Sequence, residues 1–205
     1  MLDKTGFDLW ADDYDKAVGI SDEEKTYPFA GYKDVLGRIF QTIIEKQNAT
    51  VLDIGFGTGT LTTKLYERGC VIYGQAFSSK MIDLAIRKMP DANLHQGDFT
   101  QGLVEPLYHQ SYDFIVATYS LHHLTDEQKL AFLHTLQDRL KENGKILIGD
   151  VAFETREKLN QCRDAAGDEW DDEEIYFVVD ELKSAFPNLS FTQVSYCAGI
   201  LTLAR

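Results

Sequence analysis

One stretch, residues 50–61, limits the folds open to this chain more than any other. It begins with an apolar, partly β-branched run over 51–54, which is typical of a strand covered on both faces. Glycine then stands at every second position, at Gly55, Gly57 and Gly59. Because glycine has no Cβ, the backbone there can approach a ligand closely, and positive φ costs little. The stretch therefore predicts a buried strand, a glycine turn and a helix whose first N–H groups face a polar ligand.

Asp53 is the charged residue of this strand, near the end at which the glycine turn begins. In an open α/β sheet, the carboxyl ends of the strands face the crevice that binds ligands. We therefore expect the Asp53 carboxylate to point at a ligand rather than to be buried by chance.

Strand and helix patterns alternate through the middle of the chain. Short apolar runs predict five strands, at 50–54, 71–75, 93–96, 113–117 and 145–151. Helical patterns lie between them, near 59–68, 78–88 and 126–140. Such alternation with short loops predicts a parallel sheet with helices on both faces.

The pattern changes in the last quarter of the chain. A helix is expected near 154–165, and the acidic run 168–174 predicts a solvated segment. The last two strand patterns, 190–196 and 200–204, are joined by so short a link that they must form an antiparallel hairpin. The expected fold class is α/β: a Rossmann-like three-layer sandwich whose mostly parallel sheet of about seven strands ends in this hairpin.

The composition narrows the classes of partner. The chain carries 33 acidic and 20 basic residues, a net charge of -13, whereas a nucleic-acid binder presents a basic face. No apolar run reaches the roughly 18 residues of a membrane span, and the N-terminus has no leader pattern. Three scattered cysteines fit a reducing compartment. We expect a cytoplasmic protein that acts on a small molecule, with neither nucleic acid nor membrane as partner. The oligomeric state stays open.

The spacing of the glycines separates two kinds of cofactor. A dinucleotide-binding turn needs Gly-x-Gly-x-x-Gly, whereas here Gly59 comes one residue early and Asp53 precedes the turn. This pattern resembles the first motif of the class I S-adenosylmethionine-dependent methyltransferases. The resemblance implies that the three glycines approach the methionine part of S-adenosylmethionine. It also implies that Asp53 helps to orient the amino end.

Further motifs follow in the order of that family. Asp98 and Phe99 resemble its third-strand motif, in which the acid bonds the adenine amino group and the neighbour packs on the ring. Residues 113–124 resemble its fourth-strand motif. There the resemblance implies a structural role for Asp113 and a place beside the cofactor for Thr118, at the distal end.

The resemblance covers roughly residues 5–205, includes the turn at 140–145, and is closest to the YrrT-type methyltransferases. It implies a single methyltransferase domain, 1–205. Its expected parts are a helical lid at 1–47, a cofactor-binding half at 48–151, and substrate-side helices with the terminal hairpin at 152–205.

The lid has an amphipathic helical pattern, with Phe7, Trp10 and Tyr14 on one face. We expect it to pack on the sheet and close over the cofactor. Tyr14 and Tyr119 are candidates for contact with the cofactor carboxylate or with the substrate.

One position departs from the family. At the end of the second strand, two residues after Gly74, the family expects an acid that holds both ribose hydroxyls, but this chain has Ala76. A missing charge-assisted acceptor could cost about 1.5–3 kcal/mol, or roughly ten- to a hundredfold in affinity. Gln75 could replace it only by a backbone shift, because strand alternation points it to the other face. Ser78 or a water could bond one hydroxyl.

His122 and His123 follow the fourth strand, where the resemblance places the transferred methyl group. Histidine titrates near neutrality and can take a proton from an oxygen or nitrogen acceptor, so these two are the catalytic candidates. The alternative is that one packs beneath the next helix and the other is solvated. Adjacent histidines at a strand end tend to point apart, so no metal site is expected.

The sequence thus predicts methyl transfer from S-adenosylmethionine to a small-molecule acceptor by in-line displacement, for which the protein chiefly aligns the reactants. Ala76 leaves an alternative open: a catalytically weakened protein of the same fold that binds S-adenosylmethionine or S-adenosylhomocysteine. A nicotinamide-dependent oxidoreductase is a remote alternative, because the glycine spacing is wrong for it.

Overall fold

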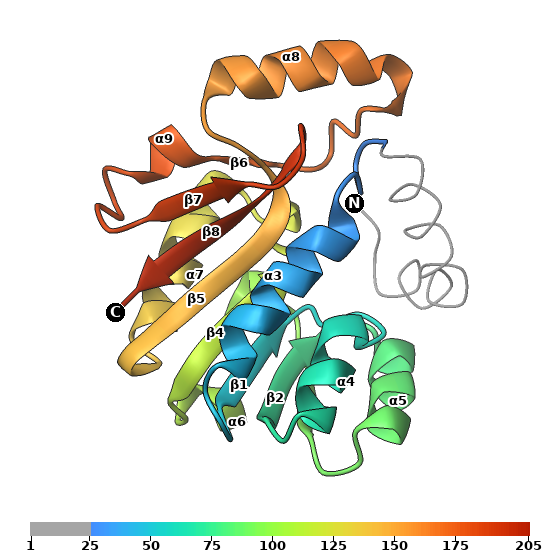
Figure 1. Cartoon of the computed structure of the whole chain (residues 1–205), viewed down its shortest axis with the longest axis vertical. Helices are drawn as coiled ribbons and strands as arrows, with labels where there is room; N and C mark the ends of the chain where they lie inside the picture. The colour runs from blue at the N-terminus through green and yellow to red at the C-terminus, as the bar shows by residue number, and fades with distance from the viewer. Residues whose placement is uncertain (1–25) are drawn as a thin grey trace.

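The computed structural model describes residues 26–205 (Figure 1). Most of the expected lid, with Phe7, Trp10 and Tyr14, lies outside the described residues. No helix within 26–205 combines the length and the apolar character needed to cross a bilayer.

The strands of the described residues form one sheet in the order β3-β2-β1-β4-β5-β8-β7, with β6 paired to β5 (Figure 1). The expected parallel strands are β1 Thr50–Ile54, β2 Val71–Ala76, β3 Asn93–Gln96, β4 Tyr112–Thr118 and β5 Leu140–Phe153. The C-terminal pair, β7 Ser190–Gln193 and β8 Ala198–Ala204, is antiparallel, and β8 also pairs antiparallel with β5. The mostly parallel sheet with a terminal hairpin is therefore confirmed. The short β6, Phe177–Val178, adds an eighth strand to the seven expected.

Helices follow the strands as the alternation predicts. Within residues 26–205, the α-helices are α3 Tyr32–Ile44, α4 Thr60–Glu67, α5 Ser79–Lys88, α6 Glu105–Tyr108, α7 Asp126–Gln137, α8 Arg156–Ala166 and α9 Val179–Leu182. The same part of the chain holds three short 3₁₀ turns: η1 Phe99–Gln101, η2 Leu121–His123 and η3 Gly167–Glu169.

Two core clusters separate the faces of the sheet. Because side chains alternate along a strand, Val51 packs with Ile39 of α3 and Leu65 of α4, whereas Leu52 packs with Phe132 of α7. Figure 1 shows α3 lying across the front of the sheet and α7 behind β5. The chain therefore has the three layers expected of an α/β fold.

The start of β5 lies earlier than the sequence pattern suggests. The strand begins at Leu140 rather than near residue 145, and α7 ends at Gln137. Its register against β4 jumps, since Tyr112 pairs with Leu140 but Phe114 pairs with Lys145. The turn expected at 140–145 is thus an irregularity inside a longer strand.

Asp113 fixes the end of the sheet that lies opposite the glycine turn. Its carboxylate accepts hydrogen bonds from Lys46 Nζ at 2.6 Å, Lys141 Nζ at 3.1 Å and the Thr50 N–H at 2.8 Å. Burial alone would raise the pKa of Asp113, but these hydrogen bonds and charges outweigh it and hold the pKa at about 2. The geometry supports the structural role that the resemblance implied for this acid.

Candidate active site

A cavity of about 370 Å³ opens at the carboxyl ends of the parallel strands. Two groups of lining residues face it, and we name them here. The glycine-turn wall consists of Gly55, Gly57, Ala76, Asp98 and Phe99. The histidine wall consists of His122, His123, Asp171 and Glu174.

The three glycines of the turn all have positive φ, but their structural roles differ. A Cβ on Gly55 would lie 2.5 Å from the Ser120 Cβ, so side-chain packing requires glycine there. A Cβ on Gly57 would meet no atom within 4 Å and would project into open space. Gly59 precedes α4 and does not line the cavity. Gly57 is thus the position at which a ligand can come closest to the backbone.

Asp53 lies beneath the turn rather than open to the cavity. The residue is 1% exposed, and its Oδ2 accepts a hydrogen bond from Thr62 Oγ1 at 2.5 Å. Burial raises the pKa of Asp53 to about 7, although the Thr62 hydroxyl counteracts part of this effect. Its Oδ1 is buried without a hydrogen-bond partner among the described residues. The first turn of α4 therefore covers the carboxylate, and the expected orientation of Asp53 toward a ligand stays a prediction.

Ala76 lies at the end of β2, lines the cavity and is 3% exposed. The neighbouring Gln75 points to the other face, as strand alternation predicts. Its Nε2 donates to Gly102 O, and its Oε1 accepts from the Val104 N–H, both at 2.9 Å. Both polar atoms of the Gln75 side chain are therefore already hydrogen-bonded outside the cavity. Ser78 lines the cavity, but its hydroxyl caps α5 by accepting the Met81 N–H at 3.2 Å.

Asp98 and Phe99 both line the cavity, next to the glycine turn. Asp98 Oδ1 accepts the Thr100 N–H at 2.9 Å, which fixes the orientation of the carboxylate. Thr118, a predicted cofactor contact, is not among the lining residues. The next residue, Tyr119, lines the cavity instead, and its backbone has a positive φ of 49°.

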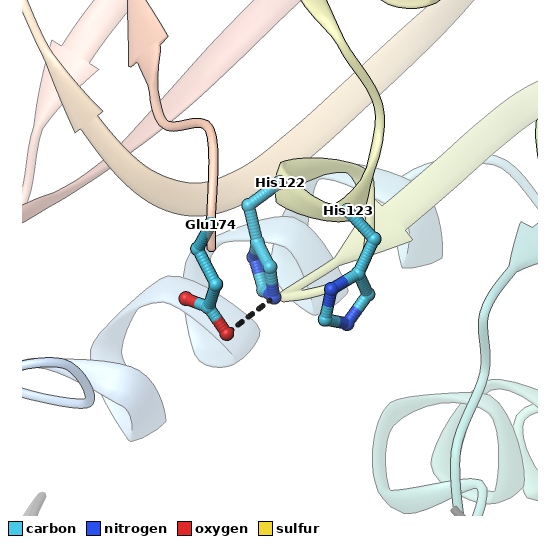
Figure 2. A group of neighbouring side chains, drawn as sticks. All are labelled: His122, His123 and Glu174. Carbon is cyan, nitrogen blue, oxygen red and sulfur yellow. Dashed lines mark ion pairs between the residues drawn. The ribbon is translucent and has the colours of Figure 1, made fainter. Parts of the chain in front are cut away.

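His122 is the centre of the histidine wall (Figure 2). Its Nδ1 lies 2.7 Å from Asp150 Oδ1, and its Nε2 lies 3.4 Å from Glu174 Oε1. Burial alone would lower the pKa of His122, but the two carboxylates outweigh it and raise the pKa above its usual value. Burial and the neighbouring His122 lower the pKa of His123 to about 4. The two histidines therefore occupy opposite electrostatic environments.

The premise that the two histidines point apart is wrong. Their ring centroids lie 4.3 Å apart in an edge-to-face arrangement. Both belong to η2, a tight 3₁₀ turn rather than the end of an extended strand. Figure 2 shows both side chains descending on the same side as Glu174.

Sequence reasoning missed the carboxylates of this wall. The acidic run 168–174 suggested a solvated segment, yet Asp171 and Glu174 line the cavity. The segment is anchored because the Ile175 N–H donates to His122 O at 2.8 Å and the buried Lys129 Nζ donates to Ile175 O. The one available signal was Trp170, an aromatic residue inside the acidic run; its ring stacks on Tyr27 at 5.1 Å.

Aromatic hydroxyl groups extend the wall away from the cavity. Tyr176 OH donates to Glu174 Oε2 at 2.7 Å and hydrogen-bonds the Tyr27 hydroxyl. The contacts join residues that are 149 positions apart in sequence. Glu174 is consequently held so that its Oε1 faces His122.

Comparisons with known proteins agree on one family. A methyltransferase-domain family model matches residues 51–144. A protein of Geobacillus thermodenitrificans named "Uncharacterized methyltransferase" is 38% identical over 194 residues, covering 91% of this chain and 87% of that protein. A second of the same name, from Anoxybacillus flavithermus, is 39% identical over 151 residues, covering 74% and 68%.

Solved structures agree on the fold. The DhpI–SAH complex superposes with a TM-score of 0.70 at 18% identity, covering 97% of this chain and 92% of that one. The magnesium protoporphyrin IX methyltransferase (ChlM) of Synechocystis, with bound SAH, gives 0.67 at 19% identity, covering 86% and 84%. At 18–19% sequence identity, this structural similarity shows a shared fold alone.

Proposed function

The chain belongs to the class I S-adenosylmethionine-dependent methyltransferases, and from that premise we propose that it methylates a small molecule held against the histidine wall. The observation that carries the proposal is a cavity whose two walls differ in chemistry. One wall presents open backbone, apolar surface and the Asp98 carboxylate; the other is a cluster of imidazoles and carboxylates. A cavity of about 370 Å³ suits a small acceptor, and the net charge of -13 disfavours nucleic acid.

The glycine-turn wall fits S-adenosylmethionine, the cofactor of this family. The empty space at the Gly57 Cβ position would admit the methionine part close to the backbone. Beneath the turn, Asp53 Oδ1 has no hydrogen-bond partner among the described residues and can accept one from a ligand. Asp98 Oδ2 and the Phe99 ring would hold the adenine, with Ala76 beside the ribose. When bound, S-adenosylmethionine supplies a methyl group on a sulfonium that is itself the leaving group, so transfer to the acceptor is an in-line displacement.

The histidine wall would orient the acceptor and take its proton. An oxygen or nitrogen acceptor needs a base within hydrogen-bond reach. Asp150 holds His122 through Nδ1, which directs Nε2 toward Glu174 and the cavity. A carboxylate in this position also stabilises the imidazolium that forms when Nε2 takes the proton. Asp171 and Glu174 line the cavity on this side.

Ala76 supports a second candidate, a protein of the same fold with weakened catalysis. Gln75 is turned away, so neither side chain at the end of β2 offers the acid that the family expects. Family membership leaves the nicotinamide-dependent alternative without support.

Calorimetric titration with S-adenosylmethionine and S-adenosylhomocysteine tests the proposal, followed by incubation with a panel of small hydroxyl, amine and thiol compounds. We expect binding of both cofactors and release of S-adenosylhomocysteine with at least one compound class. No heat with either ligand at millimolar concentration would refute the cofactor site. Binding without turnover across the panel would favour the weakened protein.

A further inference from the structure

We propose that His122, His123 and Glu174 form a binding site for a divalent transition-metal ion at the acceptor end of the cavity. Each residue offers one ligand atom, and the three atoms all lie within 4.8 Å of one another (Figure 2). Two imidazoles and one carboxylate are a donor set that suits Zn²⁺, Fe²⁺, Co²⁺ and Mn²⁺ better than Mg²⁺ or Ca²⁺.

The separations are close to those of a loaded site. Ligand atoms about 2.0–2.2 Å from a tetrahedral ion lie roughly 3.3–3.6 Å from one another. His122 Nε2 and Glu174 Oε1 are 3.4 Å apart without any movement. The widest separation, at most 4.8 Å, has to close by about 1 Å, which is within reach of a side-chain adjustment.

The surrounding residues hold two of the three ligands in the required orientation. Asp150 binds His122 Nδ1 at 2.7 Å, which leaves Nε2 as the ligand nitrogen. Tyr176 OH binds Glu174 Oε2 at 2.7 Å, which leaves Oε1 as the ligand oxygen. Outer partners of this kind fix the ring orientation and the basicity of metal ligands, and they are common in metal sites.

The local charge favours a cation. Asp150 Oδ2 is buried without a hydrogen-bond partner among residues 26–205, beside Glu174 and Asp171. The nearby Lys129 Nζ is already bound to Asp126 Oδ1 and Ile175 O. A divalent ion would balance the carboxylates that flank His122.

Three protein ligands leave at least one coordination position open, as in catalytic metal sites. All three ligand residues line the cavity, so that position can face an acceptor with an oxygen, nitrogen or sulfur donor. In the metal-bound protein, the ion rather than His122 Nε2 would contact the acceptor. The ion would also lower the pKa of the acceptor's donor atom. This role rests on the proposed function, but binding of the ion does not.

The competing interpretation is a simple ion pair between His122 and Glu174, and metal titration separates the two. Full-length protein stripped with a chelator is titrated with Co²⁺, whose visible absorption reports nitrogen and oxygen ligands. We expect one ion per chain with micromolar or tighter affinity, displacement by Zn²⁺, and no competition from millimolar Mg²⁺. His123→Ala and Glu174→Gln should each weaken Co²⁺ binding at least tenfold, and Asp150→Asn should weaken it about ten- to a hundredfold.

The exposed pair of His109 and Glu105, 3.6 Å apart, provides a matched control. Glu105→Gln alters a histidine–carboxylate pair outside the cavity, so it should leave Co²⁺ binding unchanged. Absence of a Co²⁺ spectrum, or equal binding by the Glu174→Gln and Glu105→Gln variants, would overturn the metal site. S-adenosylhomocysteine affinity measured in the same samples confirms that each variant is folded. If that affinity persists when Co²⁺ does not bind, the metal site alone has failed.

Discussion

The two walls of the cavity are built in different ways. The glycine-turn wall consists of short segments that each follow their own strand, and it works by leaving space, as the open Cβ position of Gly57 shows. The histidine wall is assembled by side chains from separate segments, and it works by fixing charge between Asp150, His122 and Glu174. Substitutions should therefore act by occlusion on the first wall and by loss of hydrogen bonds and charge on the second.

Filling the open space of the glycine turn should have the largest effect. Gly57→Leu would project a side chain into the volume that the cofactor needs, so we expect S-adenosylhomocysteine affinity to fall about a thousandfold or more, equivalent to about 4 kcal/mol. Calorimetry measures the loss. The left-handed backbone at φ 55° would cost a leucine roughly 1–2 kcal/mol, so the variant should still fold.

Gly69→Leu is the matched control for that strain. Gly69 also has positive φ, at the end of α4, but it does not line the cavity. It should lower the melting temperature while leaving the affinity for S-adenosylhomocysteine within about twofold. Equal loss of affinity in both variants would mean that backbone strain, not occlusion, explains the effect.

The second largest effect should come from the histidine wall. His122→Asn keeps a polar group near Asp150 but removes Nε2, so turnover should fall roughly 10²- to 10⁴-fold. S-adenosylhomocysteine affinity should stay nearly constant, because His122 lies on the other wall. Measuring turnover and S-adenosylhomocysteine affinity on one preparation tests whether the two walls act separately.

His134→Asn serves as the control for loss of an imidazole. His134 packs against Phe186 at 4.6 Å and does not line the cavity. If His122→Asn weakened cofactor binding as much as turnover, the two walls would not be functionally separate.

The different construction of the two walls explains which cavity residues could be predicted from the sequence. Much of the glycine-turn wall was predictable because a strand and its turn are contiguous: Gly55 and Gly57 follow from local spacing, and Asp98 and Phe99 follow from the family resemblance of a short motif. The histidine wall was only half predictable. His122 and His123 stand at a strand end, but Glu174 reaches them through Lys129, Ile175 and Tyr176, whose contacts depend on tertiary packing. An acidic run in a sequence does not reveal which of its side chains is held against the cavity by tertiary contacts.

Two aspartates of neighbouring strands extend the comparison to stability. Asp53 lies under the glycine turn with its pKa raised to about 7, whereas Asp113 lies at the opposite end of the sheet with its pKa held at about 2. A raised pKa means that the folded state binds more protons, so Asp53 makes the free energy of unfolding fall as the pH rises from about 4 to 7. Asp113 has the opposite sign: its contribution is present above about pH 4 and is lost as the pH falls toward 2.

Chemical denaturation from pH 3 to pH 8, without ligand, measures both slopes. Asp53→Asn should remove the decline between pH 4 and 7, an effect on the order of 2–4 kcal/mol. Asp113→Asn should leave that decline intact and destabilise the protein at neutral pH, because the Lys46 and Lys141 contacts lose their charge partner. An unchanged decline in the Asp53→Asn variant would show that other groups cause it.

The smallest expected effect concerns the ribose. Ala76 faces the cavity and Gln75 does not, so Ala76→Asp should place a carboxylate where the family has one and tighten S-adenosylhomocysteine binding about tenfold. Ser79→Asp adds the same charge three positions along, outside the lining residues, and should leave the affinity unchanged. A gain confined to Ala76→Asp would mean that the glycine-turn wall has lost an anchor while the histidine wall remained complete. A loss would mean that the cofactor pocket has adapted to the missing acid, and that both walls are specialised.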